Sequence, residues 1–137
     1  MTRDELFEIS EITRKLDRME EHLEELREVA RSAGSVDTTK ERTTGADVRA
    51  GMAVADKIMD MESDMRLFKG RRDSLRAEAR KLFAQLDGLE YDIMMRRYVD
   101  VLRWTDVSKV VGYDMRYVYR IHQRALDKLF DHSKPLP

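Results

Sequence analysis

Arginine recurs at every fourth position near the end of this 137-residue chain, at Arg116, Arg120 and Arg124. Residues four apart share one face of an α-helix, so these side chains would form a single basic ridge. A guanidinium group can bind phosphate or, through two parallel donors, the edge of a guanine base. Because most charged stripes on helices are only solvated surfaces, the ridge indicates anion binding only if neighbouring residues direct it outward.

Residues 105–121 have the spacing that would direct the ridge outward, that of two short helices packed across a tight turn. Such a pair needs a small residue at the close approach, a glycine in the turn and apolar residues facing inward. The residues at these positions are Val107, Ser108, Val111, Gly112, Tyr113, Val118 and Ile121. We expect Thr105 or Asp106 to cap the first helix and Asp114 to cap the second. The inward stripe of the second helix would consist of Val118, Ile121, Ala125 and Leu129.

A pair of helices of this kind is the helix-turn-helix, whose second helix lies in the major groove of DNA. We therefore predict that the chain binds double-stranded DNA in a sequence-specific way. The recognition helix would comprise residues from about 114 to 128. Its candidate DNA contacts are Met115, Arg116, Tyr117, Tyr119, Arg120, Gln123, Arg124 and Lys128. The flanking cations expected to contact phosphate are Arg96, Arg97, Arg103 and Lys109. We expect Trp104 to pack inside this domain rather than to stack on a base.

Residue types needed for several other chemistries are missing or badly placed. The chain has no cysteine, which excludes disulfides and thiolate chemistry and is consistent with a reducing cytoplasm. His22, His122 and His132 are too far apart in sequence to predict a metal site. The acidic residues at 60–64 lack the glycine and the later glutamate of a calcium loop. Without a phosphate-binding glycine loop or a nucleophile motif, we predict no enzyme activity, no cofactor and no metal.

The charge distribution differs between the two ends of the chain. Residues 1–33 carry six Lys/Arg against ten Asp/Glu, a balance of −4, whereas residues 103–128 carry six against three, a balance of +3. We therefore expect the two ends to have different roles. No apolar run reaches the roughly 18–20 residues of a membrane span, so we predict a cytoplasmic protein with no membrane partner.

Two apolar seams, meaning lines of apolar residues three and four apart, predict two long helices before the DNA-binding region. The first seam consists of Ile9, Ile12, Leu16, Met19, Leu23, Leu26, Ala30 and Ala33. Thr2 or Asp4 would cap its helix, and residues 34–46 form a polar loop rich in Ser, Thr and Gly. Asp47 would cap the second helix. Its seam consists of Met52, Ala55, Ile58, Met61, Met65, Phe68, Arg72, Leu75, Ala79, Leu82, Leu86 and Leu89.

The predicted fold is therefore all-α, with a long antiparallel helical hairpin or coiled coil followed by a C-terminal helix-turn-helix. We place the hairpin in residues 1–86, for dimerisation or partner binding, and the DNA-binding domain in residues 87–137, with Asp87 as the cap of its first helix. A seam does not identify its own partner. We favour pairing of the two helices within one chain, and a homodimer through these helices is the alternative.

Residues of about 86–130 resemble region 4 of the sigma-70 class, and in particular the sigma-like regulators of phages and prophages of the ArpU and RinA type. The resemblance runs through LEYDIMMRRYVD, WTDVSKVVGY and VYRIHQRALDKL, and covers about a third of the chain. It implies promoter-region DNA binding and transcriptional regulation without catalysis. In such a regulator the N-terminal helices would dimerise the chain or present a surface to a partner such as RNA polymerase. One departure is Asp114, because Ser or Thr is usual at this position. The aspartate still suits a cap, but it brings a negative charge close to DNA.

Two other functions are compatible with the same features. The first is a small-terminase-like subunit that recognises DNA for phage packaging, which would also join a helix-turn-helix to an oligomerising helical part. The second is a structural interaction protein that does not bind DNA. A ring-sized mass would favour the packaging subunit, and absence of salt-dependent DNA affinity would favour the structural protein.

Overall fold

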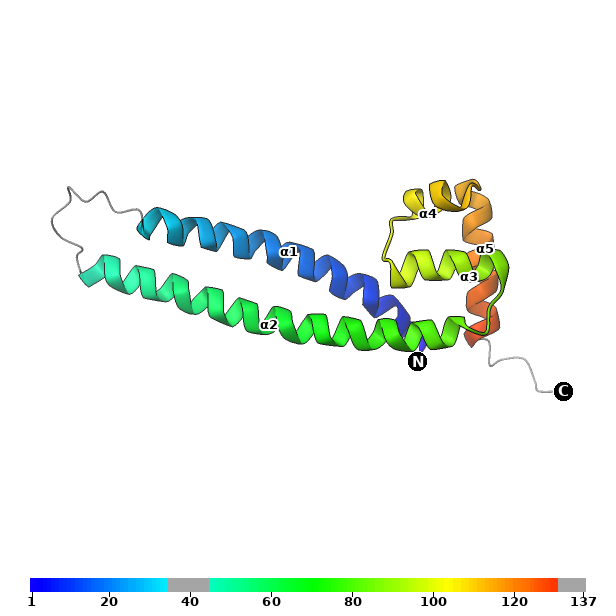
Figure 1. Cartoon of the computed structure of the whole chain (residues 1–137), viewed down its shortest axis with the longest axis horizontal. Helices are drawn as coiled ribbons and strands as arrows, with labels where there is room; N and C mark the ends of the chain where they lie inside the picture. The colour runs from blue at the N-terminus through cyan, green and yellow to red at the C-terminus, as the bar shows by residue number, and fades with distance from the viewer. Residues whose placement is uncertain (35–44, 131–137) are drawn as a thin grey trace. The chain divides into compact units, whose positions relative to one another are not determined.

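The computed structural model describes residues 1–34 and 45–130, with the side chains of 1–32 and 48–130. Every element in these ranges is helical (Figure 1), so the prediction of an all-α fold is confirmed. The elements are α1 (Arg3–Gly34), α2 (Gly45–Phe83), α3 (Gly88–Met94), the short π-helix η1 (Met95–Val99), α4 (Trp104–Val111) and α5 (Met115–Phe130). Helix α2 begins at Gly45, so Asp47, the predicted cap, lies two residues after the start of the helix. Most of the predicted polar loop, residues 35–44, lies outside the described residues.

The chain divides into two compact units, which we name the hairpin unit (residues 14–70) and the terminal unit (residues 1–13 and 71 to the C-terminus). This division differs from the predicted boundary between residues 86 and 87. The reason is that both ends of the expected hairpin pack with the C-terminal helices. In the terminal unit, the rings of Phe7 from α1 and Phe83 from α2 each lie 6.2 Å from the ring of Tyr98.

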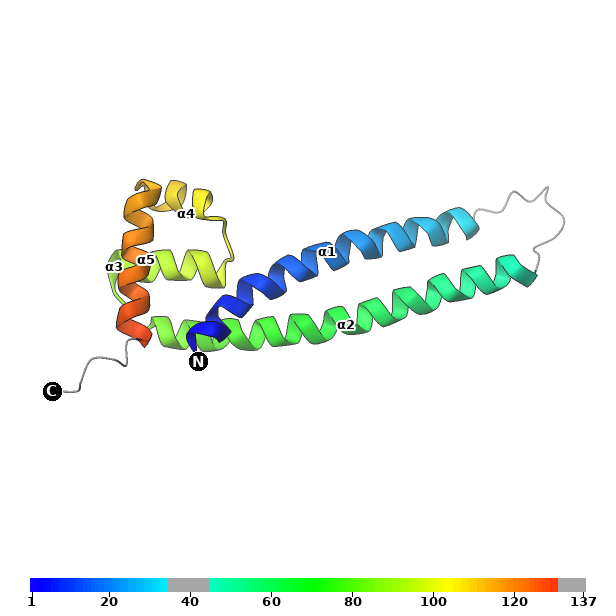
Figure 2. The same ribbon diagram turned by 180° about the vertical axis from the view of Figure 1, so that it is seen from behind.

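In the hairpin unit, α1 and α2 run side by side in opposite directions (Figures 1 and 2). Leu16, Leu23 and Met65 are buried there, as the two seams predict. Further contacts join the two helices. Lys15 places its ammonium 4.3 Å from the centre of the Phe68 ring, and an Arg27 guanidinium nitrogen lies 3.5 Å from a Glu62 carboxylate oxygen. The structure therefore places the pairing of the long helices within one chain.

The early part of the second seam was predicted wrongly. Met52 is 63% exposed and Ala55 is exposed, although both were expected on the buried side of α2. Met52 precedes Met65 by thirteen residues, which at 3.6 residues per turn places it about 140° around the helix. Steps of three or four residues differ slightly from the 3.6 residues of one helical turn. These differences add up over this length, so the apolar side of α2 turns away from α1.

The start of α1 follows the predicted capping pattern. The Thr2 hydroxyl accepts a hydrogen bond from the Glu5 backbone N–H at 3.1 Å, and the Thr2 backbone N–H donates to the Glu5 carboxylate at 3.4 Å. This reciprocal arrangement is a capping box, and it satisfies two backbone donors that the first helical turn leaves free. Thr2 rather than Asp4 is therefore the cap.

A buried apolar cluster in the terminal unit positions α4 and α5. It consists of Ile93 from α3, Val107 from α4, and Val118 and Ile121 from α5. Packed against it are Leu89, Leu102, Trp104 and Val111. Both α3 and α4 lie across α5 in the two views (Figures 1 and 2). The inward stripe of α5 is confirmed except at its end, where Leu126 is buried and Leu129 is only half-buried.

Candidate nucleic-acid interface

The turn between α4 and α5 has the local geometry that the sequence predicts. Gly112 has φ 77° and ψ 25°, a left-handed conformation that glycine adopts without steric cost. Its backbone N–H donates to the Ser108 carbonyl at 2.9 Å, and the Ser108 hydroxyl donates to the Tyr113 carbonyl. The Asp114 carboxylate accepts a hydrogen bond from the Tyr117 backbone N–H at 2.9 Å, so Asp114 caps α5 as expected.

The start of α4 was predicted too late. The helix begins at Trp104, and the cap position is occupied by Arg103, whose side chain makes no capping hydrogen bond. Thr105 and Asp106 therefore lie in the first turn and are not caps. The backbone N–H groups of Asp106 and Val107 donate to the Arg103 carbonyl at 3.0 and 2.9 Å. Asp106 still complements the positive end of the helix dipole.

The first half of α5 presents its predicted contact residues to solvent. Arg116 and Arg120 are exposed, Tyr119 is 43% exposed and Met115 is half-buried. The Trp104 ring packs edge-on against Tyr119 at 5.1 Å, as expected for a tryptophan inside the domain. In the part of the chain that the structure describes, neither Arg116 nor Arg120 has a hydrogen-bond or ion-pair partner. These two guanidinium groups are thus free to bind an external anion or base edge.

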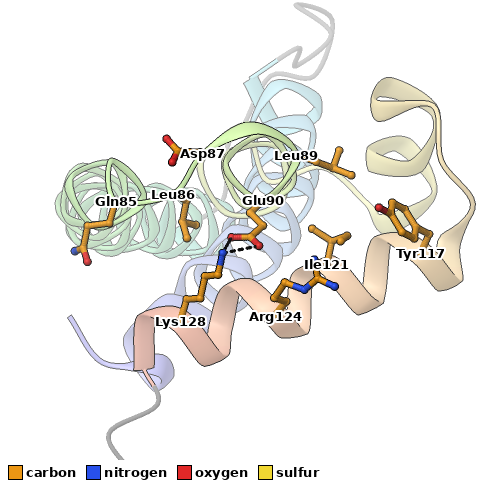
Figure 3. Close-up of a pocket in the computed structure, with 9 residues that line it drawn as sticks. All are labelled: Gln85, Leu86, Asp87, Leu89, Glu90, Tyr117, Ile121, Arg124 and Lys128. Atoms are coloured by element: carbon orange, nitrogen blue, oxygen red, sulfur yellow. Dashed lines mark hydrogen bonds and ion pairs between the residues drawn. The ribbon is translucent and has the colours of Figure 1, made fainter. Parts of the chain in front are cut away.

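Arg124 is also exposed and has no ion-pair partner among the described residues, but it lies further around α5 than the two arginines of its first half, close to the direction of Tyr117. Arg124 and Tyr117 line an open pocket of about 250 Å³ between α3 and α5, together with Leu89 and Ile121 (Figure 3). From Arg116 to Arg124 the helix turns by about 80° beyond two full turns, since each residue adds about 100°. The basic ridge predicted from four-residue spacing is therefore twisted, with Arg124 directed toward α3.

The last turns of α5 use their polar side chains within the protein. The Lys128 ammonium lies 2.9 Å from both carboxylate oxygens of Glu90, which is only 8% exposed (Figure 3). The Gln123 amide donates to the Asp127 carboxylate at 3.0 Å, and Arg3 lies 3.9 Å from the same carboxylate oxygen. Lys128 and Gln123 were predicted as DNA contacts from their place on the helix, and these partners were not foreseen.

The four flanking cations separate into two groups. Arg97 belongs to the interior, because its guanidinium lies 4.7 Å from the centre of the Trp104 ring and donates to the Leu102 carbonyl at 2.8 Å. Arg96 lies 3.4 Å from the Asp100 carboxylate. Arg103 and Lys109 are exposed, and the described residues offer neither an ion-pair partner. Only this second pair remains fully available for the predicted phosphate contacts.

A tyrosine–histidine pair behind the site was not predicted from sequence. The Tyr98 hydroxyl lies 2.6 Å from Nε2 of His122, and their rings stack at 5.7 Å. Burial, followed by the positive charges of Arg97 and Arg3, lowers the pKa of His122 from 6.5 to about 4. Burial raises the pKa of Tyr98 to about 12. Both groups are therefore neutral near pH 7, and the hydrogen bond between the Tyr98 hydroxyl and Nε2 takes its direction from the tautomer of His122.

His122 also contacts Trp104 edge-on at 4.6 Å, so the pair supports the ring that packs against Tyr119. The signal that could have identified this pair is weak, because Tyr98 and His122 are 24 residues apart on different elements. Glu90, Asp127 and Arg3 were missed for the same reason. Their partners are set by helix packing, which sequence spacing does not specify.

Residues 1–34 and 45–130 contain no group of three or more His, Asp or Glu side chains placed to hold a metal ion. None of the helices in these ranges has the length and apolar character needed to cross a membrane. No family model matches the chain, and neither the curated proteins nor the solved structures include a match.

Proposed function

We propose that the chain is a sequence-specific DNA-binding regulator of transcription, in which α4, the Gly112 turn and α5 form a helix-turn-helix. In this proposal α5 lies in the major groove of double-stranded DNA, and the chain has no catalytic role. The resemblance of residues 86–130 to region 4 of the sigma-70 class supports this proposal, as does the spacing of the buried cluster that holds α4 against α5.

The single observation that carries the proposal is the pair of free arginines at the start of α5. Arg116 and Arg120 are exposed and have no ion-pair partner among the described residues, whereas Lys128, Arg96 and Arg3 each lie beside a carboxylate. Without a bound anion, the two exposed arginines destabilise the helix slightly, because like charges four residues apart repel each other. Phosphate groups and guanine edges would remove this repulsion and satisfy the donors.

The flanking residues fit the same docking geometry. Arg103 lies at the N-terminal end of α4, where the positive end of the helix dipole also attracts phosphate. Lys109 is exposed near the other end of α4. Cations on both sides of the turn would contact the phosphate backbone while α5 contacts base edges. The hairpin unit would present a surface to a partner such as RNA polymerase, or to a second copy of the chain.

A salt titration of DNA binding tests the proposal. Affinity of the full chain for a fluorescent 24-base-pair duplex library would be followed by anisotropy from about 50 to 300 mM salt. We expect the logarithm of the binding constant to fall linearly with the logarithm of the salt concentration. Arg116→Ala with Arg120→Ala should weaken binding by at least about tenfold and reduce this slope, while helicity by circular dichroism stays the same.

The matched control removes two exposed arginines of the hairpin unit, Arg18 and Arg49, by substitution with alanine. This variant has the same net charge as the double variant in α5, so a general loss of positive charge would weaken both equally. Unchanged affinity and salt dependence in the α5 variant would show that this face does not bind DNA. Absence of any salt-dependent affinity in the unmodified chain would remove the proposal altogether.

A further inference from the structure

The outward side of α5 is divided into a free first half and an occupied second half. Arg116 and Arg120 have all their guanidinium donors available within the described structure. One turn later the Gln123 amide is bonded to Asp127, whose carboxylate also lies near Arg3. The amide that could bond an adenine is thus engaged, and a carboxylate follows it where DNA phosphates would be repelled.

The third arginine does not extend the free half. Arg124 lines the pocket between α3 and α5, as do Ile121 and Tyr117 (Figure 3). Arg124 is exposed, but it lies about 80° around α5 from Arg116 and nearer the C-terminus, beyond the N-terminal residues that a recognition helix directs at base edges. Base contacts by arginine are therefore limited to two side chains, which lie one turn apart.

The distance between these two side chains along the helix sets the spacing of their targets. Four residues of α-helix advance about 6 Å, and successive base pairs are separated by about 3.4 Å. Two arginines on one face therefore match two base pairs that are about two steps apart. The most specific partner of an arginine in the major groove is guanine, whose O6 and N7 accept both guanidinium donors.

Phosphate is the alternative target of these arginines, and the positions of the other cations disfavour it. Arg103 and Lys109 are exposed on α4 and are free of ion pairs among the described residues, so they can supply the backbone contacts. A helix-turn-helix directs the N-terminal half of its second helix at base edges. Arg116 and Arg120 both lie in this half of α5.

We infer that the chain selects DNA containing two guanines about two base-pair steps apart, one bound by Arg116 and the other by Arg120. This inference rests on the proposed function, because it requires α5 to lie in the major groove. The specificity of one α5 helix is then confined to a few base pairs, since Gln123 and Arg124 do not add contacts to base edges.

The test uses guanine analogues in a selected site. The full chain would first select duplexes from a library of 20 random base pairs. Each guanine of the best-bound duplex would then be replaced singly by 7-deazaguanine, which lacks the N7 acceptor but keeps Watson–Crick pairing. We expect two positions, about two steps apart, at which this replacement weakens binding about fivefold, because one of two bonds to arginine is lost.

The variants assign each position to one side chain. Arg116→Ala should remove the effect of 7-deazaguanine at one of the two positions, and Arg120→Ala should remove it at the other. Arg124→Ala is the matched control, an arginine of the same helix, and it should keep both effects. Circular dichroism would check that each variant is as helical as the parent chain.

Two results would overturn the inference in different ways. Selected duplexes that bind with normal salt dependence, but lack the guanine pair or tolerate 7-deazaguanine throughout, would refute the guanine contacts and leave the proposed function intact. A library that the chain does not bind at all would remove both the inference and the proposed function.

Discussion

His122 should make the stability of the terminal unit depend on pH between about 4 and 6.5, the range between its native and ordinary pKa values. Its native pKa is depressed, so in this range the unfolded chain binds more protons than the folded chain. The stabilisation is therefore complete above pH 6.5 and is lost as the pH falls toward 4. Protonation would place a positive charge in a partly buried position beside Arg97 and Arg3.

The size of the effect follows from the two pKa values. The difference between 6.5 and about 4 corresponds to about 3 kcal/mol at 1.36 kcal/mol for each pH unit. Because the imidazole is only partly buried, solvent screening reduces this value, and we expect about 2 kcal/mol. The loss should appear as a lower free energy of unfolding at pH 4 than at pH 7.5, beyond the loss due to other titrating groups.

Comparison with His122→Gln isolates this contribution, because the glutamine amide can donate to or accept from the Tyr98 hydroxyl but does not titrate. Urea unfolding followed by circular dichroism would be measured at pH 4 and 7.5 for both proteins. The parent should lose about 2 kcal/mol more than the variant. His22→Gln changes an exposed histidine of α1 and serves as the control, with the pH dependence of the parent. The reasoning would be refuted if the parent and His122→Gln lost the same free energy of unfolding between pH 7.5 and 4. An NMR titration of His122 near 6.5 would refute it as well.

Three further predictions concern the turn, the buried ion pair and the cap. Gly112→Ala should lower the free energy of unfolding by about 1 kcal/mol because of its left-handed φ, whereas Gly70→Ala, inside α2, should raise it by a similar amount. Lys128→Met should cost about 1–2 kcal/mol by leaving the Glu90 carboxylate buried without its partner, and adding Glu90→Gln should recover most of the loss in urea unfolding. Asp114→Ser should keep the cap and strengthen DNA binding about threefold at low salt, since a charge that repels phosphate is removed. An unchanged or weaker affinity would place Asp114 away from the DNA.

Several features that depend on residues within about four positions were predictable from the sequence, although the caps of α2 and α4 were not. The Thr2 capping box, the left-handed Gly112 and the Asp114 cap are each made by a few consecutive residues, whose types favour one local geometry. The buried side of α5 was also predictable at Val118, Ile121 and Ala125, because it repeats within two or three turns. Over a longer distance the apolar pattern predicted the wrong side of the helix at Met52, because small angular deviations from the helical repeat had accumulated.

The tertiary structure decided which polar groups are free and which are engaged. Glu90 and Lys128 are 38 residues apart, and Tyr98 and His122 are 24 apart, so only the packing of α3, η1 and α5 brings each pair together. By itself the sequence determined an all-α chain with an arginine-bearing helix after a glycine turn. Helix packing then placed Arg124 at the pocket between α3 and α5 and joined Lys128 to Glu90, which left Arg116 and Arg120 as the free arginines in the first half of that helix.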